Sequence, residues 1–343
     1  IMDEPTATLT ENEVSVLFAL IDRLRQRGVA ILYISHKLRE IEQIADRVTV
    51  LRDGHLVDSG SMAGRSKEEL ARLMVGREIT EMYPPRTYLP SDAPVVLEVR
   101  DMVVPGAVKQ ASFTLRQGEV LGFGGIVGAG RTALIEAVLG LRGKSAGQVL
   151  RNGQPVVLRH LRDAVHQRIA YLTEDRKGKG LVLNMDMRSN VTLLNLRAHC
   201  HPLIDRRREE QAFQQAIQRF DIRLRTAART AAELSGGNQQ KLLLAKVMSI
   251  DPEVVIINEP TRGIDVGTKH QIYHFIHELT EAGCSVILIS SEMGELIGLS
   301  HRVAVMCAGV LTGVLEGEQI NEHEIMQYAS GIKGVEVDEQ HHG

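Results

Sequence analysis

Apolar residues gather along the chain in short runs, each bounded by polar or glycine-containing segments. Val254–Ile257 and Ser285–Ile289 are two such runs, and runs of this length are typical of buried strands. The same pattern predicts strands at Val95–Val104 and Ser112–Leu115, and a helix that starts near Arg131 after a glycine-rich turn. We therefore expect an α/β protein.

The apolar runs are too short to cross a membrane, which takes about 18 to 20 apolar residues. The first residues, Ile1–Pro5, also lack the basic start and apolar core of a signal peptide. We expect any membrane role to depend on a partner.

Composition and charge remove further classes of protein. With 43% hydrophobic and 24% charged residues, the chain has the make-up of a soluble globular protein. Lys and Arg number 40 against 43 Asp and Glu, so no broad attraction for nucleic acid or anionic lipid is expected. Cys200, Cys284 and Cys307 lack metal-ligand spacing and read as reduced thiols.

The start of the chain resembles its last third at a constant offset of 255 residues. Asp3–Thr6 aligns with Asn258–Thr261, and Arg47 and Val48 align with Arg302 and Val303. Such a register over many positions predicts an internal repeat. The glycine turn near residue 125 would have its counterpart 130 positions before the numbering begins, so we expect the first copy to lack its front.

Between the copies, Tyr83–Pro94 holds four of the ten prolines, which interrupt regular hydrogen bonding. We expect the C-terminal part of a first domain at 1–76, a proline-rich linker at 77–94, a complete second domain at 95–333 and a polar tail at 334–343.

The glycine-rich turn has the spacing of a phosphate-binding loop. Gly125, Gly128, Gly130 and Thr132 fit the pattern GxxxxGK[ST], with Arg131 in the place of lysine. Glycines let backbone N–H groups turn toward phosphates, the following helix adds its positive end, and the threonine hydroxyl can ligate Mg²⁺. An ordinary glycine turn between strand and helix is the simpler alternative.

A second glycine motif is more specific. Leu234–Lys241 reads LSGGNQQK and resembles the signature sequence of ABC ATPases. Ser235, Gly236 and Gly237 at a helix start could bind a γ-phosphate, and Gln239 completes the motif. A serine N-cap with flexible glycines is the alternative reading for the SGG part alone.

The strand that ends at Glu259 resembles the family's Walker B element, in which an aspartate supports Mg²⁺ and a glutamate polarises the attacking water. The first copy has both acids, as Asp3 and Glu4. The second copy has Asn258 instead of the aspartate and keeps Glu259 as the candidate base.

Two further positions match by resemblance. His36 follows an expected strand at Val29–Ile34, where an ABC ATPase places its switch histidine, and its counterpart is Ser291. Glu174 occupies the glutamine position of the family's Q-loop, which meets the membrane partner. The resemblance assigns Glu4, His36 and Glu259 to catalysis, Asp3 and Thr132 to the metal, and the two glycine motifs with Glu174 to nucleotide.

Taken together, these motifs are similar to the second cassette of monosaccharide importers of the ribose, galactose, xylose and arabinose type. The resemblance implies a P-loop ABC-ATPase cassette, with a mixed sheet and a helical subdomain near 180–240, present as one partial and one complete copy. It implies ATP and Mg²⁺ as cofactors, integral-membrane permease subunits as partners, an extracytoplasmic sugar-binding protein as an indirect partner, and a place on the cytoplasmic face of the inner membrane.

In this family each ATP lies between the phosphate loop of one cassette and the signature of the other. We expect the site with Asp3, Glu4 and His36 to hydrolyse ATP, and the site with Arg131, Asn258 and the serine at 291 to be degenerate. Neither site is complete within this sequence, so the chain alone should be inactive. The alternatives are a catalytically inactive remnant and a soluble tandem ABC ATPase that acts on ribosomes or nucleic acid.

Overall fold

The computed structural model describes residues 1–6, 9, 11–35, 37–52, 55–66, 69–70, 73, 82–200, 203–223 and 230–334. The chain divides into two compact units. The first comprises Ile1–Met82 with Gly263–Gln271, and the second comprises Tyr83–Arg262 with Ile272–Gly343.

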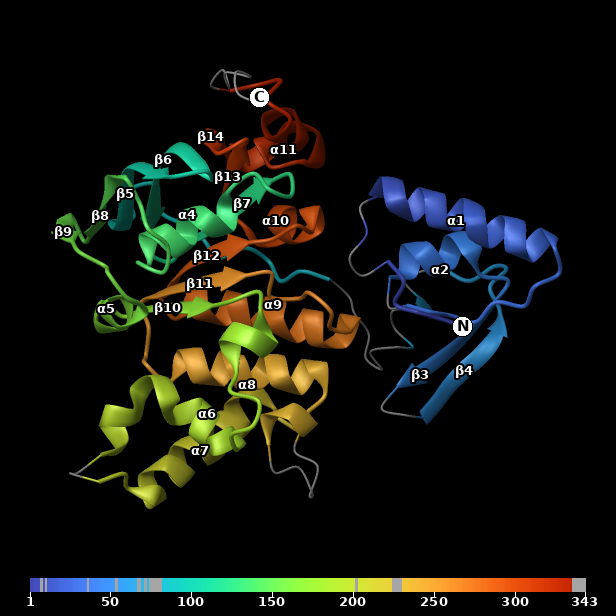
Figure 1. Ribbon diagram of the computed structural model, residues 1–343, viewed down its shortest axis with the longest axis horizontal. Helices are drawn as coiled ribbons and strands as arrows, with labels where there is room; N and C mark the ends of the chain where they lie inside the picture. The colour runs from blue at the N-terminus through green and yellow to red at the C-terminus, as the bar shows by residue number, and fades with distance from the viewer. Residues whose placement is uncertain are drawn as a thin grey trace. The chain divides into compact units, whose positions relative to one another are not determined.

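A ten-stranded mixed sheet forms the centre of the second unit (Figure 1). Its strand order is β10-β11-β12-β7-β13-β14-β6-β5-β8-β9. The strands are β5 (Val95–Val104), β6 (Val108–Arg116), β7 (Val120–Gly125), β8 (Ala146–Arg151), β9 (Gln154–Val156), β10 (Ile169–Leu172), β11 (Val254–Asn258), β12 (Ser285–Ile289), β13 (Arg302–Cys307) and β14 (Val310–Glu316).

The two halves of this sheet have different hydrophobic patterns because they differ in burial. Strands β10, β11, β12, β7 and β13 are parallel, and Val254–Ile257 is fully buried, as expected for a parallel sheet covered on both faces. Strands β6, β5, β8 and β9 are antiparallel, and buried positions of β5 and β6 are interspersed with more exposed ones. The predicted mixed sheet is confirmed.

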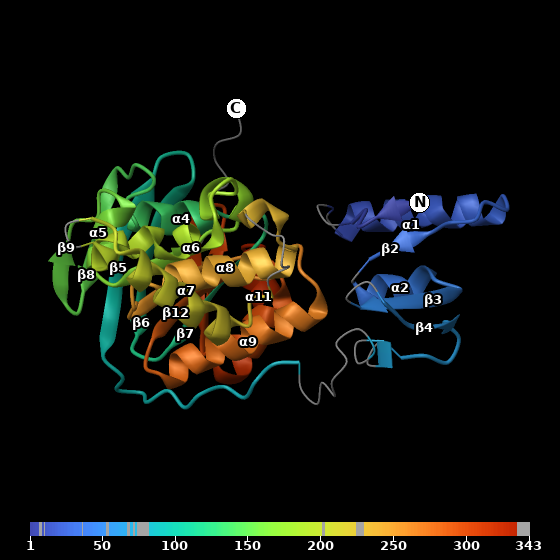
Figure 2. The same cartoon turned by 90° about the horizontal axis from the view of Figure 1, so that it is seen from below.

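Helices of the second unit cover the sheet and form a separate helical region. Helix α4 packs on β5, β6 and β7, with Leu134, Ile135 and Leu139 fully buried in the core. Helices α6, α7 and α8 contact one another and lie together in Figures 1 and 2, which confirms the helical subdomain. The described helices that belong to this unit in whole, or in part for α9, are α4 (Arg131–Val138), α5 (Leu161–His166), η1 (Arg176–Gly180), α6 (Met187–Thr192), η2 (Leu193–His199), α7 (Arg206–Phe220), η3 (Ala231–Glu233), α8 (Gly236–Met248), α9 (Val266–Glu281), α10 (Met293–Leu299), η4 (Gly317–Gln319) and α11 (Glu322–Ala329).

The described residues of Ile1–Met82 in the first unit include two short sheets and the helices α1 and α2. Strand β1 pairs with β2 in parallel, and β3 pairs with β4 in antiparallel fashion. The elements are β1 (Met2–Asp3), α1 (Glu11–Gln26), β2 (Tyr33–Ile34), α2 (Leu38–Ile44), β3 (Arg47–Arg52) and β4 (His55–Ser61). Helices α1 and α2 and strands β3 and β4 have the same lengths as α9, α10, β13 and β14, and each begins 255 positions before its match.

The strand expected at Val29–Ile34 is shorter than predicted, because only Tyr33 and Ile34 are in β-structure. The corresponding strand of the second unit, β12, pairs with β11 on one side and β7 on the other. Strand β2 pairs with β1, and a strand with one ladder has fewer hydrogen bonds to extend it.

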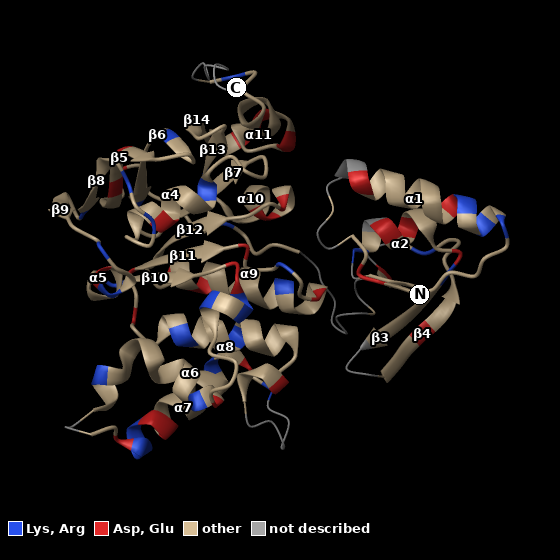
Figure 3. Cartoon of the chain, in the orientation of Figure 1, with Lys and Arg blue, Asp and Glu red and all other residues tan. Residues whose placement is uncertain are grey.

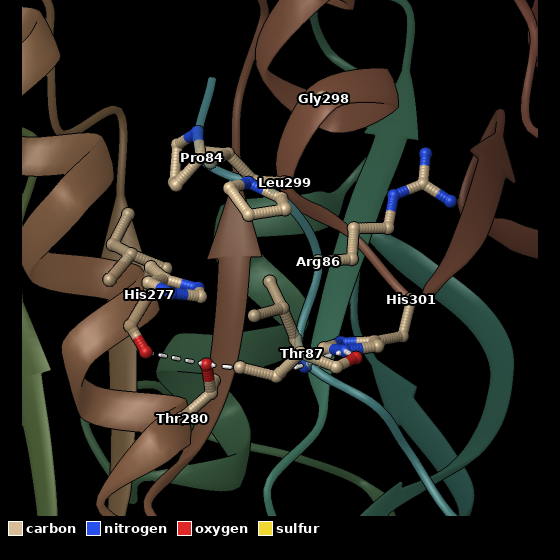
Figure 4. Close-up of a pocket in the computed structure, with 11 residues that line it drawn as sticks. Pro84, Arg86, Thr87, His277, Thr280, Gly298, Leu299 and His301 are labelled. Carbon is tan, nitrogen blue, oxygen red and sulfur yellow. Dashed lines mark hydrogen bonds between the residues drawn. The ribbon is translucent and has the colours of Figure 1, made fainter.

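The expected linker falls partly outside the described residues, at 77–81. Its described part, 82–94, forms neither helix nor strand. From Tyr83 onward it belongs to the second unit. The imidazole Nδ1 atom of His301 accepts from the N–H of Val120 at 2.9 Å, so the neutral ring donates from Nε2 to the carbonyl of Thr87, also at 2.9 Å (Figure 4).

Within the described part of the chain, the structure contains no helix long and apolar enough to cross a membrane.

Candidate nucleotide-binding site

The loop between β7 and α4 requires glycine at two positions for steric reasons. Gly125 has a φ of 142° and Gly130 a φ of 99°, in a region that L-residues rarely adopt. A Cβ atom would lie 2.4 Å from the carbonyl oxygen of Met306 at the first position and 2.5 Å from that of Ala107 at the second. Gly128 also has a positive φ, of 88°. The backbone carbonyls of Met306 and Ala107 thus lie so close to this loop that they leave no room for a side chain at Gly125 or Gly130.

The start of α4 presents backbone donors from this loop. The first hydrogen bond of the helix runs from the N–H of Leu134 to the carbonyl of Gly130 at 2.9 Å. The N–H groups of Arg131, Thr132 and Ala133 therefore lie outside the helix's own ladder, at its positive end. Together with the glycine loop, this arrangement is suited to phosphate oxygens.

The guanidinium of Arg131 reaches the end of β12. Its Nη1 atom donates to the carbonyl oxygen of Ser290 at 2.6 Å, and the side chain is buried. Burial lowers the pKa of Arg131, while the nearby carboxylates of Glu259 and Glu174 act in the opposite direction. The arginine in the lysine position thus links the phosphate loop to a neighbouring strand.

Thr132 and Asn258 face each other beside this loop. Asn258 Nδ2 donates to the hydroxyl of Thr132 at 3.2 Å and to that of Tyr171 at 3.4 Å. Asn258 is fully buried, and among the described residues no donor reaches its Oδ1 atom. The Oδ1 atom belongs to the same amide whose Nδ2 faces Thr132. An amide oxygen and a hydroxyl are both ligands that a hard cation such as Mg²⁺ accepts, although neither supplies negative charge.

Glu259 follows directly on β11 in a left-handed conformation, with a φ of 49°. Its N–H donates to the carbonyl of Ile289 at 2.8 Å, and its carboxylate accepts from the hydroxyl of Ser291 at 2.9 Å. The candidate base is therefore hydrogen-bonded to the residue that replaces the histidine.

A cleft of about 370 Å³ adjoins Glu259. Its charged lining has both signs, and Figure 3 shows acidic and basic residues where β10 and β11 end. Glu174 and Arg262 form an ion pair of 3.9 Å across it. The lining residues are Glu174, Asp175, Arg176, Lys177, Gln240, Glu259 and Arg262.

The signature segment lies at the start of α8, in the helical region. Ser235 is the N-cap, and its hydroxyl accepts from the backbone N–H of Asn238 at 3.4 Å and from its Nδ2 at 3.0 Å. Gly236 and Gly237 form the first turn. Gln239 is buried and donates to the carbonyl of Ala231 at 3.1 Å. Its amide thus packs inside the unit, whereas the serine is exposed at the helix start.

In the first unit, the acids Asp3 and Glu4 lie at the end of β1. Asp3 is exposed, and Glu4 has a φ of 44° and donates its N–H to the carbonyl of Ile34 at 2.9 Å. His36 lies outside the described residues. The geometry around Glu4 repeats that of Glu259.

Sequence reasoning missed Tyr171 and Glu295, which the structure brings close to the predicted residues. The signal for Glu295 was present, because Glu40 stands 255 positions before it. Tyr171 had no such signal, since its proximity to Asn258 depends on the pairing of β10 with β11.

The sheet, the glycine loop and the helical region define a P-loop ATPase of the ATP-binding-cassette type. In line with this fold, an ATP-binding cassette of an ABC transporter in its ADP conformation superposes with a TM-score of 0.53, at 19% identity, over 69% of this chain and 95% of the other.

A family model described as ABC transporter matches residues 108–262. The ribose import ATP-binding protein RbsA of Lacticaseibacillus paracasei is 42% identical over 337 residues, which is 98% of this chain and 67% of the relative. RbsA 2 of Agrobacterium fabrum is 44% identical over 335 residues, 96% of this chain and 66% of the relative. The chain belongs to the ABC transporter family, and it spans about two thirds of the length of these relatives.

Proposed function

We propose that the protein binds ATP with Mg²⁺ as the energy-coupling subunit of an importer for ribose or a related simple sugar. The observation that carries this proposal is the loop from Gly125 to Gly130, in which a side chain at either of these two glycines would clash with a backbone carbonyl, and which leads into the N–H groups at the start of α4. The substrate class rests on the names of the relatives, which are ribose import ATP-binding proteins.

The proposed partners follow from the same relatives. An ATP-binding import subunit works with integral-membrane permease subunits, and through them with an extracytoplasmic sugar-binding protein. We place the protein on the cytoplasmic face of the inner membrane, attached through the permease alone, and we propose no nucleic-acid partner. The near balance of 40 basic and 43 acidic residues supports this choice.

Each site residue has a proposed task. The phosphate loop and Arg131 would hold the nucleotide, and Thr132 and Asn258, which are hydrogen-bonded to each other, would hold Mg²⁺. A bound Mg²⁺ would supply positive charge to the phosphate oxygens. Glu259 is the candidate base, and Ser291 orients it. Glu174 lines the cleft beside it.

The signature, with Ser235 exposed and Gly236 and Gly237 half-buried, is proposed to bind the nucleotide of an opposing cassette. Gln239 has a supporting place in this scheme, because its buried amide holds Ala231 at the turn before α8.

We further propose that the first unit is the C-terminal part of another cassette. The matched lengths of α1 with α9 and of β3 with β13 support this. Burial supports it as well: Leu32 and Leu51 are 58% and 65% exposed, while Ile287 and Met306, 255 positions later, are fully buried. In the second unit Ile287 and Met306 pack in one core cluster with residues of β7 and α4, so another cassette would supply equivalents of these elements.

In this scheme the two nucleotide sites are unequal. The site with Asp3, Glu4 and His36 performs most hydrolysis. The site with Arg131 and Asn258 binds nucleotide and hydrolyses slowly, because an amide replaces a carboxylate next to the metal. Since each site takes parts from two cassettes, this chain alone should bind nucleotide without sustained turnover.

The test is nucleotide binding by the full chain, measured with a fluorescent ATP analogue, alongside phosphate release. Wild type should bind in a Mg²⁺-dependent manner. Gly130→Val should lose binding, because its Cβ would meet the carbonyl of Ala107. Gly143→Val is the matched control, since nothing lies within 4 Å of a Cβ there. Folded wild type without nucleotide binding would overturn the proposal.

A further inference from the structure

Glu295 on α10 is a fully buried carboxylate that joins three segments of the second unit. It accepts hydrogen bonds from the hydroxyls of Tyr273 at 2.8 Å and Ser290 at 2.6 Å. The hydroxyl of Thr261 also donates to it. These donors come from α9, from the loop after β12 and from the loop after Glu259.

Two of these segments contact the nucleotide-binding residues directly. The carbonyl of Ser290 accepts from Arg131 of the phosphate loop at 2.6 Å. Thr261 stands two positions after Glu259, which itself is bonded to Ser291. A displacement of the Glu295 side chain would therefore move the supports of both the phosphate loop and the candidate base.

We propose that Glu295 is a positioning residue for the nucleotide site of the second unit, which it orders through Ser290 and Thr261. This inference rests on the proposed nucleotide binding. An alanine at this position would remove the acceptor of the Tyr273 hydroxyl and would leave Ser290 and Thr261 only their longer contacts to Glu292, at 3.4 and 3.5 Å. Buried donors that lose their partners are costly. The loops would then rearrange to satisfy them.

The first unit has the same arrangement around Glu40. Its carboxylate accepts from the hydroxyls of Thr6 at 2.6 Å, Tyr33 at 2.7 Å and Ser35 at 3.2 Å. Thr6 and Ser35 stand 255 positions before Thr261 and Ser290. A carboxylate that holds the same two loops in both units indicates a shared task at the ends of these strands.

The two carboxylates differ in their charged neighbours. Lys37 lies 3.4 Å from Glu40, and its counterpart beside Glu295 is Glu292. Burial acts to raise the pKa of Glu40, but hydrogen bonds from Thr6 and Tyr33 and the charge of Lys37 lower it overall. Burial, reinforced by Glu292, raises the pKa of Glu295.

The groups that face Glu295 are Tyr273 of α9, Glu292 at the start of α10, and the hydroxyls of Ser290 and Thr261. Tyr83 stacks on the ring of Tyr273, and its hydroxyl lies beside Gly294, which precedes Glu295 on α10. The ionised carboxylate accepts from all three hydroxyls, whereas the protonated carboxyl must itself donate a hydrogen bond. The positioning effect should therefore weaken as pH falls.

The experiment compares wild type, Glu295→Gln and Glu295→Ala as full chains. The probe is a fluorescent ATP analogue with Mg²⁺, measured from about pH 5 to about pH 8.5. Glu295→Ala should weaken affinity about tenfold, the usual loss when a group that orients a binding residue is removed. The ratio of the dissociation constant of Glu295→Gln to that of wild type should be near one at low pH, because glutamine resembles the protonated carboxyl. This ratio should rise with pH.

Glu209→Gln is the matched control, since Glu209 is a buried carboxylate on α7 that accepts from Thr192. Its effect on affinity should not depend on pH. A pH-independent ratio for Glu295→Gln, or an equal effect of Glu209→Gln, would overturn the inference.

Hydrogen exchange provides a second readout that needs no nucleotide. In Glu295→Ala, the amides of the phosphate loop and of Ser290 to Glu292 should exchange faster than in wild type, while those of α7 should be unchanged. Unchanged exchange in the two loops would refute the positioning task, even if wild type failed to bind nucleotide and the proposed function fell separately.

Discussion

The ring of Tyr83 stacks on the ring of Tyr273, with 5.0 Å between their centroids and 30° between their planes. Tyr83 belongs to the irregular segment that follows the first unit, and Tyr273 donates to Glu295. A Cβ atom on Gly298 of α10 would come within 2.4 Å of the Tyr83 ring. The position corresponding to Gly298 in the first unit is Gln43. The glycine in α10 thus makes room for the tyrosine.

Gly298→Ala should destabilise the second unit by about 1 to 3 kcal/mol, because the added methyl group overpacks against the Tyr83 ring. Urea unfolding measures this loss. Gly143→Ala, where a Cβ meets nothing within 4 Å, should cost far less. In a Tyr83→Ala background the cost of Gly298→Ala should largely disappear, and persistence of the full cost would show that the ring is not its cause.

Asn258→Asp should make nucleotide binding more dependent on Mg²⁺, because it places a carboxylate next to the Thr132 hydroxyl. The variant should also lose stability without Mg²⁺ and nucleotide, since a buried charge without a partner is costly. Titrations of a fluorescent nucleotide at several Mg²⁺ concentrations measure the first effect. Asn321→Asp, at the N-cap of α11, is a suitable control because both residues cap helices well. An unchanged Mg²⁺ requirement would count against the assignment of Asn258 to the metal.

The raised pKa of Glu295 predicts that its contribution to the stability of the folded protein falls as pH rises. Its effect on nucleotide binding should instead grow as pH rises. The folded protein holds this proton more tightly than the unfolded chain, so the carboxyl group's stabilising effect is fully present below its ordinary pKa of 4.5. The effect is lost as pH rises through the folded-state pKa, and it amounts to about 1.4 kcal/mol for every pH unit that separates the folded and unfolded pKa values. Glu295→Gln should therefore gain stability relative to wild type with rising pH, as thermal unfolding at several pH values can show. A constant difference would mean that Glu295 does not titrate in this way.

The lowered pKa of His301 predicts that the folded protein loses stability in mild acid. Burial lowers its pKa below the ordinary 6.5, although the hydrogen bond to Thr87 opposes the shift. The unfolded chain binds this proton more readily than the folded protein does. The stabilising contribution of the neutral ring is therefore present above pH 6.5 and is lost as pH falls through the folded-state pKa. Protonation would also force a donor against the N–H of Val120. His301→Gln should reduce the loss of stability in mild acid, and His55→Gln, at an exposed position of β4, should leave it unchanged. Equal acid sensitivity in both variants would contradict this account.

The parallel strands were predictable because a strand buried on both faces reads as an unbroken apolar run. Ser285–Ile289 is such a run and is strand β12 without change, and the helix expected near Arg131 begins at that residue. Strand β2 was predicted too long, because the sequence does not reveal how many neighbours a strand has. The packing of Tyr83 could not be foreseen, since prolines indicate only that a segment is irregular.

The candidate site was predictable only as far as contiguous motifs describe it. The glycine spacing predicted the phosphate loop, and its assignment to nucleotide stays a prediction. The hydrogen bond from Arg131 to Ser290 joins residues 159 positions apart, so it depends on the strand order rather than on any local pattern. The burial of Gln239 likewise follows from the packing of α8, which the motif does not describe.

The contact between Tyr83 and Tyr273 also gives the protein an intrinsic optical signal. The chain contains no tryptophan and six tyrosines, so its near-ultraviolet fluorescence and circular dichroism come mainly from tyrosine. Two of these six rings, Tyr83 and Tyr88, lie in the irregular segment, and Tyr83 is stacked against Tyr273, which is fully buried. The spectrum of the unlabelled wild-type protein therefore reports whether this segment is seated on α9 and α10, and Tyr83→Phe isolates the part of the signal that belongs to it.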